Sequence, residues 1–182
     1  MATPTTLPSS FTAGQVLTAA QMNNIRGAFR ILQVVSTTKT DTFSVASSTY
    51  TDVTGLSVSI TPSATSSQVL VFASVAQGQG QADGITTMQL VRGSTAICIG
   101  DTAGSRRRSS AAFYAIPTNG VTQMQTNAIL FLDSPATTSA TTYKIQVQAS
   151  SGTTYVNRTG ADTDNAAWPR TASTITVMEI SA

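Results

Sequence analysis

From about Ile31 to the C-terminus, apolar and polar residues alternate with a period of two, and this pattern constrains the fold more than any other feature. The alternation is clear over Leu56–Ile60 and Thr174–Ile180, and it recurs over Tyr143–Gln148. Successive side chains of a β-strand point to opposite faces, so each stretch predicts a strand with one buried and one solvated face. No helical pattern separates these strands, which predicts an all-β body.

Two further runs, Val69–Ala73 and Ala128–Leu132, are apolar at every position. A continuous apolar run of this length is typical of a strand that is covered on both faces. The other strand candidates are bounded by turn residues: Ile31–Thr38, Thr86–Arg92, Ala96–Ile99, Ala111–Ile116 and Thr153–Asn157. Gly93 and Ser94 lie between two of them and predict a tight hairpin with glycine at its first central position.

Turn signals, among them a glycine-rich one over residues 78–84, divide the body into roughly ten short strands without crossover helices. Parallel strands need long connections, usually helices, so the sheets are predicted to be antiparallel. About 150 residues of such strands fit a two-sheet jelly-roll sandwich better than an immunoglobulin-like domain of about 100 residues. We therefore expect an arm with a short helix over residues 1–30 and a jelly-roll body over residues 31–182.

The N-terminal arm begins with ten residues rich in Pro, Thr and Ser, and a short helix signal follows. Thr18 and Gln21 have the spacing of a capping box, in which the side chain of each residue accepts a hydrogen bond from the backbone N–H of the other. The apolar stripe of this helix consists of Leu17, Met22, Ile25 and Phe29. Because a helix of about ten residues is marginal alone, we expect the stripe to bury against its own domain or another protein.

The composition excludes several kinds of function. The chain has no His, so it lacks Ser-His-Asp and Cys-His nucleophile pairs and histidine metal ligands. Its one cysteine, Cys98, can form neither an intrachain disulfide nor a zinc–cysteine site, and we interpret it as a small buried apolar residue. The net charge of +2 does not indicate nucleic-acid binding. Neither a membrane span nor a secretory signal is predicted, and we expect no cofactor.

Charged residues make up only 10% of the chain, while Ser and Thr together make up about 30%, as suits exposed strand faces. Uncharged faces do little to repel a neighbour, and the two fully apolar runs need cover on their outer side. Because the body offers no helix for this purpose, we expect a homo-oligomer, specifically a trimer of sandwiches around a threefold axis. The alternative is a monomer whose central strands are simply apolar.

Arg106, Arg107 and Arg108 form the only run of charge in the chain. Guanidinium groups make bidentate contacts to anions, so the run is a candidate contact for an anionic sugar, a phosphate or an acidic protein. The alternative is a solvated loop. Trp168, in a long loop before the last strand, is a candidate for sugar stacking or a protein contact, and equally for a residue that closes one end of the sandwich.

The acidic residues give weak signals. Asp162–Asn165 is similar to the start of a calcium loop, but it lacks the central Gly and the Glu at the twelfth position, so we interpret it as a polar turn and predict no metal site. A glycosidase needs two carboxyl groups about 5–10 Å apart, and nothing in the sequence places such a pair. Asn157–Thr159 matches the glycosylation pattern, which we treat as coincidence.

Residues 11–23, FTAGQVLTAAQMN, resemble a short N-terminal module of bacteriophage virion proteins with the pattern F-x-A-G-x-x-L-T-A-A-x-x-N. Four stretches of the body are similar to phage fibre and capsid decoration proteins: residues 31–35, 52–62, 90–95 and 132–135. The resemblance implies a homotrimeric jelly roll, comparable to the tumour-necrosis-factor fold, on a virion assembled in the bacterial cytoplasm. It also implies attachment to the particle through the N-terminal module. We assign this contact to Phe11 and to the apolar stripe of the helix, Leu17, Met22, Ile25 and Phe29.

Two functions remain open at this point. In the first, residues 1–30 dock onto other virion proteins, the body forms a trimeric fibre, knob or decoration protein, and Arg106–Arg108 and Trp168 contact a host surface glycan or a neighbouring protein. This function requires no catalysis. In the second, the sandwich is a free carbohydrate-binding lectin, which would not need the N-terminal module, or a glycan-active enzyme, which would need two facing carboxylates.

Overall fold

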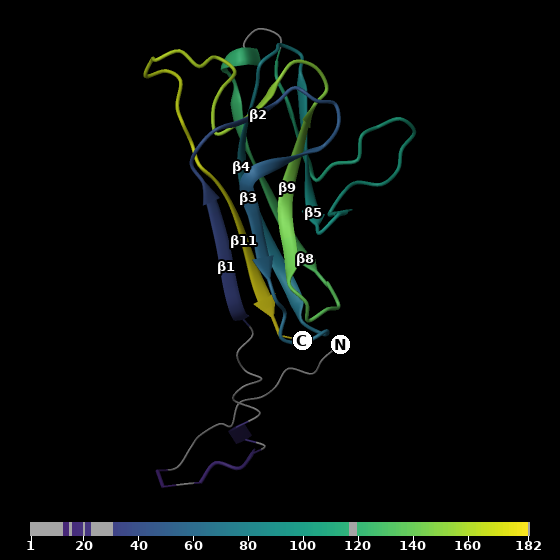
Figure 1. Cartoon of the computed structure of the whole chain (residues 1–182), viewed down its shortest axis with the longest axis vertical. Helices are drawn as coiled ribbons and strands as arrows, with labels where there is room; N and C mark the ends of the chain where they lie inside the picture. Colours follow the sequence, from purple (N-terminus) through teal and green to yellow (C-terminus); the bar gives the residue numbers. More distant parts are fainter. Residues whose placement is uncertain (1–12, 15, 20, 23–30, 117–119, 182) are drawn as a thin grey trace.

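The computed structural model describes residues 13–14, 16–19, 21–22, 31–116 and 120–181, and its strands form two sheets packed face to face (Figure 1). The strands are β1 (Ile31–Lys39), β2 (Phe43–Val45), β3 (Thr51–Ile60), β4 (Gln68–Gln79), β5 (Ile85–Arg92), β6 (Thr95–Ile97), β7 (Ala111–Tyr114), β8 (Met124–Asp133), β9 (Thr141–Ala149), β10 (Thr154–Val156) and β11 (Ser173–Ile180), with one 3-10 turn, η1 (Gly120–Thr122). Within these described ranges no helix is long and apolar enough to cross a membrane. The prediction of an all-β body is confirmed.

The strand order is that of a jelly roll. Sheet A runs β1-β11-β4-β8, with β10 beside the second half of β4 and β2 beside β10. Sheet B runs β3-β9-β5, and both β6 and β7 pair with the far edge of β5. Apart from the short strands β2, β6 and β10, the first strand pairs with the last, the second with the seventh, the third with the sixth and the fourth with the fifth. This antiparallel hairpin, rolled into two sheets, confirms the predicted jelly-roll sandwich.

The core consists of alternate side chains from the two inner faces. Sheet A contributes Val69, Val71, Ala73, Ile129, Ile175 and Val177. Sheet B contributes Leu56, Val58, Met88, Leu90, Tyr143, Ile145 and Val147. Each large apolar side chain gains about 1.5–3 kcal/mol when it is fully buried, so the two-residue period of the sequence directly favours this arrangement.

β4 continues through Gly78 to Gln79, where the glycines predicted a turn. A Cβ on Gly78 would collide with the backbone carbonyl of Arg158, and a Cβ on Gly160 would collide with the carbonyl of Gln79. These glycines therefore allow two segments to approach closely and do not reverse the chain. The prediction of a turn that begins at Gly78 is wrong for this reason.

The turn between β5 and β6 forms as predicted, because Arg92 pairs with Thr95 and Gly93 has a φ of +59°. β6 ends at Ile97, two residues earlier than predicted. Cys98 has a φ of +53°, a left-handed conformation that cannot continue a strand. Its side chain is half-buried at the edge of the core, and this burial raises the pKa of the thiol.

Asn157 joins three segments where β1 ends and β11 begins. Its buried Nδ2 donates to the carbonyls of Lys39 at 2.8 Å and Asp41 at 2.9 Å, and its Oδ1 accepts from Ser173 Oγ at 2.6 Å. The residue also has a φ of 65°, which Asn tolerates better than most residues. An amide that is buried and fully bonded cannot carry a glycan in the folded protein, which agrees with treating the glycosylation pattern as coincidence.

The predicted capping box is present in the arm. The backbone N–H of Gln21 donates to Thr18 Oγ1 at 3.2 Å, and the backbone N–H of Thr18 donates to Gln21 Oε1 at 2.9 Å. The N–H of Met22 donates to the carbonyl of Thr18 at 3.0 Å, which closes the first helical turn. The rest of the predicted helix falls on residues 23–30, outside the described part of the chain.

Glu179 is a buried carboxylate at the other end of the sandwich, and it is only 1% exposed. Its Oε1 accepts from the N–H of Ser63 at 2.7 Å and from Ser63 Oγ at 2.6 Å, while its Oε2 accepts from Gln33 Nε2 at 2.6 Å. Burial alone raises the pKa of Glu179, but the hydrogen bonds from Ser63, Gln33 and Ser67 outweigh it and lower the pKa to about 2. The carboxylate thereby joins β1, β11 and the loop before β4.

Replacing Glu179 by Gln is expected to destabilise the protein at neutral pH by about 2 kcal/mol, because an amide turns an NH₂ group towards these donors. The folded pKa lies below the ordinary value of 4.5, so the carboxylate stabilises the fold fully above that pH. This stabilisation is lost as the pH falls from 4.5 towards 2. Thermal unfolding across this range should show a steeper loss of Tm for the natural protein than for Glu179→Gln.

The control is Asp164→Asn, which removes an exposed carboxyl from the loop before β11. It should leave the acid dependence of Tm as it is in the natural protein. An acid dependence that Glu179→Gln does not change would contradict the role given to Glu179.

Candidate functional site

The four long strands of sheet A place no charged side chain on its outer face, and the nearest charge is Arg158, which stacks on Tyr155 of β10 at 3.7 Å. The four long strands, β1, β4, β8 and β11, contain three charged residues, namely Lys39, Asp133 and Glu179. All three are buried on the inner side. Lys39 pairs with Asp41 at 2.7 Å and Asp133 pairs with Arg92, while Glu179 is held by the hydrogen bonds described above. A partner can therefore cover this outer face without desolvating a charge.

Six apolar side chains are contiguous on this surface and are called the apolar face: Val34, Leu70, Phe72, Leu130, Leu132 and Met178. The strand register places in one row Val34, Met178, Leu70 and Leu132, and in the next row Phe72 and Leu130. Exposure is 54% for Val34, 44% for Phe72, 68% for Leu130 and 47% for Leu132. Burying the exposed parts of these four would contribute about 4 kcal/mol per subunit. A contiguous exposed patch of this kind is typical of an interaction surface.

The outer face of sheet B is polar, and its side chains hydrogen-bond to one another. Asp52 accepts from Lys144 Nζ at 2.7 Å and from Gln146 Nε2 at 2.6 Å, and Gln146 in turn accepts from Gln89 at 2.6 Å. The hydrogen bond from Lys144 lowers the pKa of Asp52. The two sheets therefore have opposite outer surfaces, and the contiguous apolar patch is on sheet A.

The two continuous apolar runs of the sequence are the neighbouring strands β4 and β8. Each run faces the core on one side and contributes to the apolar face on the other. Nothing in the described residues covers that outer side. Cover by a neighbouring subunit therefore stays a prediction.

Arg106 and Arg107 line a surface hollow of about 420 Å³, called the arginine hollow. Its other lining residues are Ile85, Thr87, Ser105, Ser109 and Ala112. The loop between β6 and β7 forms one wall and extends sideways from the edge of sheet B (Figure 1). Arg108 does not line the hollow. Its Nε donates to the carbonyl of Gly100 at 2.6 Å and its own carbonyl accepts from Tyr50 at 2.9 Å, so it fastens the loop.

Trp168 lines a separate hollow of about 270 Å³ in the loop before β11. Its indole N–H donates to Thr163 Oγ1 at 2.9 Å, and the half-buried ring lies outside the core cluster. The structure therefore does not bring Trp168 together with Arg106 and Arg107. The reading of Trp168 as a closing residue of the core finds no support, and its role in binding stays a prediction.

Asp162, which lies beside Trp168, is engaged by two arginines. Both carboxylate oxygens of Asp162 are engaged, by Arg158 at 3.2 Å and by Arg170 at 2.6 Å. No group of three metal-ligating side chains occurs among the residues that the structure describes. The interpretation of Asp162–Asn165 as a polar turn agrees with these contacts.

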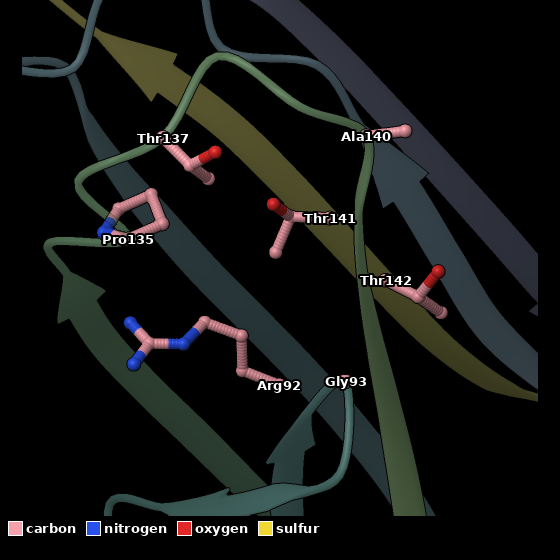
Figure 2. Close-up of a pocket in the computed structure, with 7 residues that line it drawn as sticks. All are labelled: Arg92, Gly93, Pro135, Thr137, Ala140, Thr141 and Thr142. Atoms are coloured by element: carbon pink, nitrogen blue, oxygen red, sulfur yellow. The ribbon is translucent and has the colours of Figure 1, made fainter.

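A third hollow, of about 290 Å³, lies between the β5–β6 turn and the β8–β9 loop (Figure 2). Arg92 extends along its wall, and Nη1 donates to both oxygens of Asp133 at 2.8 and 2.9 Å. Tyr143 also donates to Asp133, at 2.6 Å. Burial, and then the hydrogen bond to Asp133, raises the pKa of Tyr143 far above its usual range. These three residues connect sheet A to sheet B, so their role is structural.

The start of β1, which follows the arm in the chain, and the Trp168 loop lie at opposite ends of the sandwich. Ile31 pairs with Ile180, so the arm joins the body where β11 ends, whereas the Trp168 loop precedes the start of β11 (Figure 1). Two of the predicted attachment residues, Leu17 and Met22, are exposed. The others lie outside the described residues: Phe11, Ile25 and Phe29.

Sequence reasoning missed part of the apolar face. At the end of β11 the residue types depart from the apolar-in, polar-out pattern: the apolar Met178 points outward and the acidic Glu179 points into the sandwich. Val34 lies on the same side as Met178, its partner in the register. The signal was an apolar residue at a polar position of the alternation, next to an acidic residue at an apolar position.

Comparison with protein-family models and with curated proteins finds no match. Comparison with solved structures finds chains from infectious bursal disease virus. For the Gt strain the identity is 13% and the TM-score 0.41, over 84% of this chain and 42% of that chain. For the VP2 subviral particle the identity is 15% and the TM-score 0.37, over 81% of this chain and 40% of that chain. This chain thus spans less than half the length of those chains.

Proposed function

We propose that this chain is a non-enzymatic structural protein of a bacteriophage virion, a homotrimeric fibre, knob or decoration protein anchored by its N-terminal arm. The observation that carries the proposal is the apolar face. A charge-free surface spanning four strands is costly to leave in water, whereas a sandwich that works alone needs no such surface. Assembly into a larger body gives it a use.

A second copy of the chain is the partner that the apolar face fits best. The face offers no charge to a partner of opposite sign, and two copies of it meet without repulsion between like charges. Identical subunits related by a rotation close into a ring and leave no copy of the face exposed. Three copies around an axis satisfy this condition and match the trimer implied by the resemblance to phage proteins.

The arm is the proposed attachment to other virion proteins. It leaves the body at one end, while the loop of Trp168 lies at the other, so an anchored subunit presents that loop to the outside. Leu17 and Met22 are exposed and available for docking. Phe11, Ile25 and Phe29 complete the proposed contact, which rests on the resemblance of residues 11–23 to the phage module.

The alternative is a free lectin or a glycan-active enzyme. The hollows at Trp168 and at Arg106 and Arg107 suit sugar binding in either case, so they do not separate a lectin from a virion protein. The engaged carboxylate of Asp162 does not favour an enzyme at the Trp168 hollow, because neither of its oxygens is free to act on a substrate. A free lectin has no use for the arm, so the arm separates the two functions.

Replacing Leu130 by Asp should convert the trimer to a monomer, because it puts a charge at the most exposed side chain of the apolar face, where no partner charge is available. The measurement is the mass in solution by light scattering. The natural protein should have three times the mass of one 18.8 kDa chain. Ser57→Asp, on the exposed side of β3 in sheet B, is the matched control and should stay trimeric. A natural protein that is monomeric at micromolar concentration would contradict the proposed trimer.

Deleting residues 1–30 should leave a soluble trimer that no longer enters particles, because the strands and the apolar face are retained while the arm is lost. The measurement is the amount of the protein in purified virions, with the mass in solution recorded in parallel. Leu17→Asp with Met22→Asp should reduce incorporation in the full-length chain. Normal incorporation of the truncated chain would show that the arm is not the anchor.

A further inference from the structure

We infer that the arginine hollow binds an acidic saccharide, with Arg106 and Arg107 holding a sugar carboxylate. This inference names the ligand class for one surface contact of the proposed function and rests on it in that respect. Its physical basis lies in the loop between β6 and β7 and is separate from the apolar face.

Arg107 is held in place by buried neighbours. With the carboxamide of Gln148 oriented to satisfy its surroundings, its Oε1 accepts from Thr87 Oγ1 at 2.8 Å and from Arg107 Nε at 3.3 Å, and its Nε2 donates to the carbonyl of Ser48. Thr87 and Gln148 are themselves buried. The contact uses the Nε side of the guanidinium and leaves its two terminal NH₂ groups for a ligand. A side chain fixed in this way loses little conformational freedom on binding.

None of the positive charges of this loop is in an ion pair within the described residues. Eight basic residues lie in the described part of the chain, and five of them make ion pairs: Lys39, Arg92, Lys144, Arg158 and Arg170. The other three are Arg106, Arg107 and Arg108, and Asp101 of the same loop pairs with none of them. Arginines at a hollow without an internal counter-ion attract an anionic ligand.

The lining and the size of the hollow favour a sugar over a simple anion. Ser105, Ser109 and Thr87 offer hydroxyl groups, which both donate to and accept from sugar hydroxyls. Ile85 and Ala112 add a small apolar floor for the C–H face of a ring. A volume of about 420 Å³ exceeds what a single phosphate fills and lies within the range of small-ligand sites.

The test measures binding of a trigalacturonate, with the neutral galactose trisaccharide and inorganic phosphate as the other two probes, by calorimetric titration of the full-length protein. The acidic trisaccharide should bind, and Arg106→Gln with Arg107→Gln should weaken it by roughly tenfold or more, since charge-assisted contacts are lost. Lys144→Gln removes one positive charge on the outer face of sheet B, away from both hollows, and is the control, which should bind as the natural protein does.

Absence of binding, or equal binding by the double variant, would overturn the inference. Equal affinity for the neutral trisaccharide would exclude the carboxylate contact, and phosphate that binds as tightly as the acidic sugar would reduce the hollow to a simple anion site. The mass in solution of each variant separates this result from the proposed function. A trimer that binds no acidic sugar contradicts only this inference, whereas a monomer that binds it contradicts only the assembly.

Discussion

Every strand of this sandwich has two faces, and the fold requires only that the inner faces of the two sheets meet. That requirement places alternate apolar side chains such as Val71 and Ile145 in the core. The few charged side chains that point inward must be paired or hydrogen-bonded, because an unpaired buried charge is costly. Glu179 is held by donors from Ser63 and Gln33, and Asp133 by Arg92 and Tyr143. Once the interior is satisfied, the outer faces are free to differ, and the proposed functions lie there.

The three proposed functions lie on separate parts of the outer surface. Sheet A offers an apolar face suited to self-assembly, and sheet B carries a self-satisfied polar network and a loop with unpaired arginines. The arm joins the body at the end opposite the Trp168 loop. Because these regions do not share residues, each can be changed without disturbing the others, which makes their roles separable by mutation.

The elements of the fold could be predicted from the sequence because a strand leaves a local signal, the two-residue period. The jelly-roll class followed from strand number and short connections, but the pairing of β1 with β11 has no local signal. The sequence predicts a turn at Gly78 because it does not show the contact that requires a glycine there. That contact is with the carbonyl of Arg158, 80 positions further along the chain. The contact of Arg107 with Gln148 was hidden for the same reason. The arginine run could be identified as a candidate site from the sequence. The sequence does not show that Arg107 lines the hollow whereas Arg108 holds the loop through the carbonyl of Gly100.

The position of β11 has a consequence for biosynthesis. The last strand of the chain lies in the interior of sheet A, between β1 and β4, so β1 stays without a neighbour until residues 173–180 have left the ribosome. Closure of sheet A thus waits for a strand that lies far along the chain from β1, as expected for a topology dominated by distant pairings. A chain that lacked residues 173–180 would have a gap in the middle of the apolar face, because β11 places Met178 between Val34 and Leu70. The strand that completes the fold is therefore also the strand that completes the surface proposed for assembly.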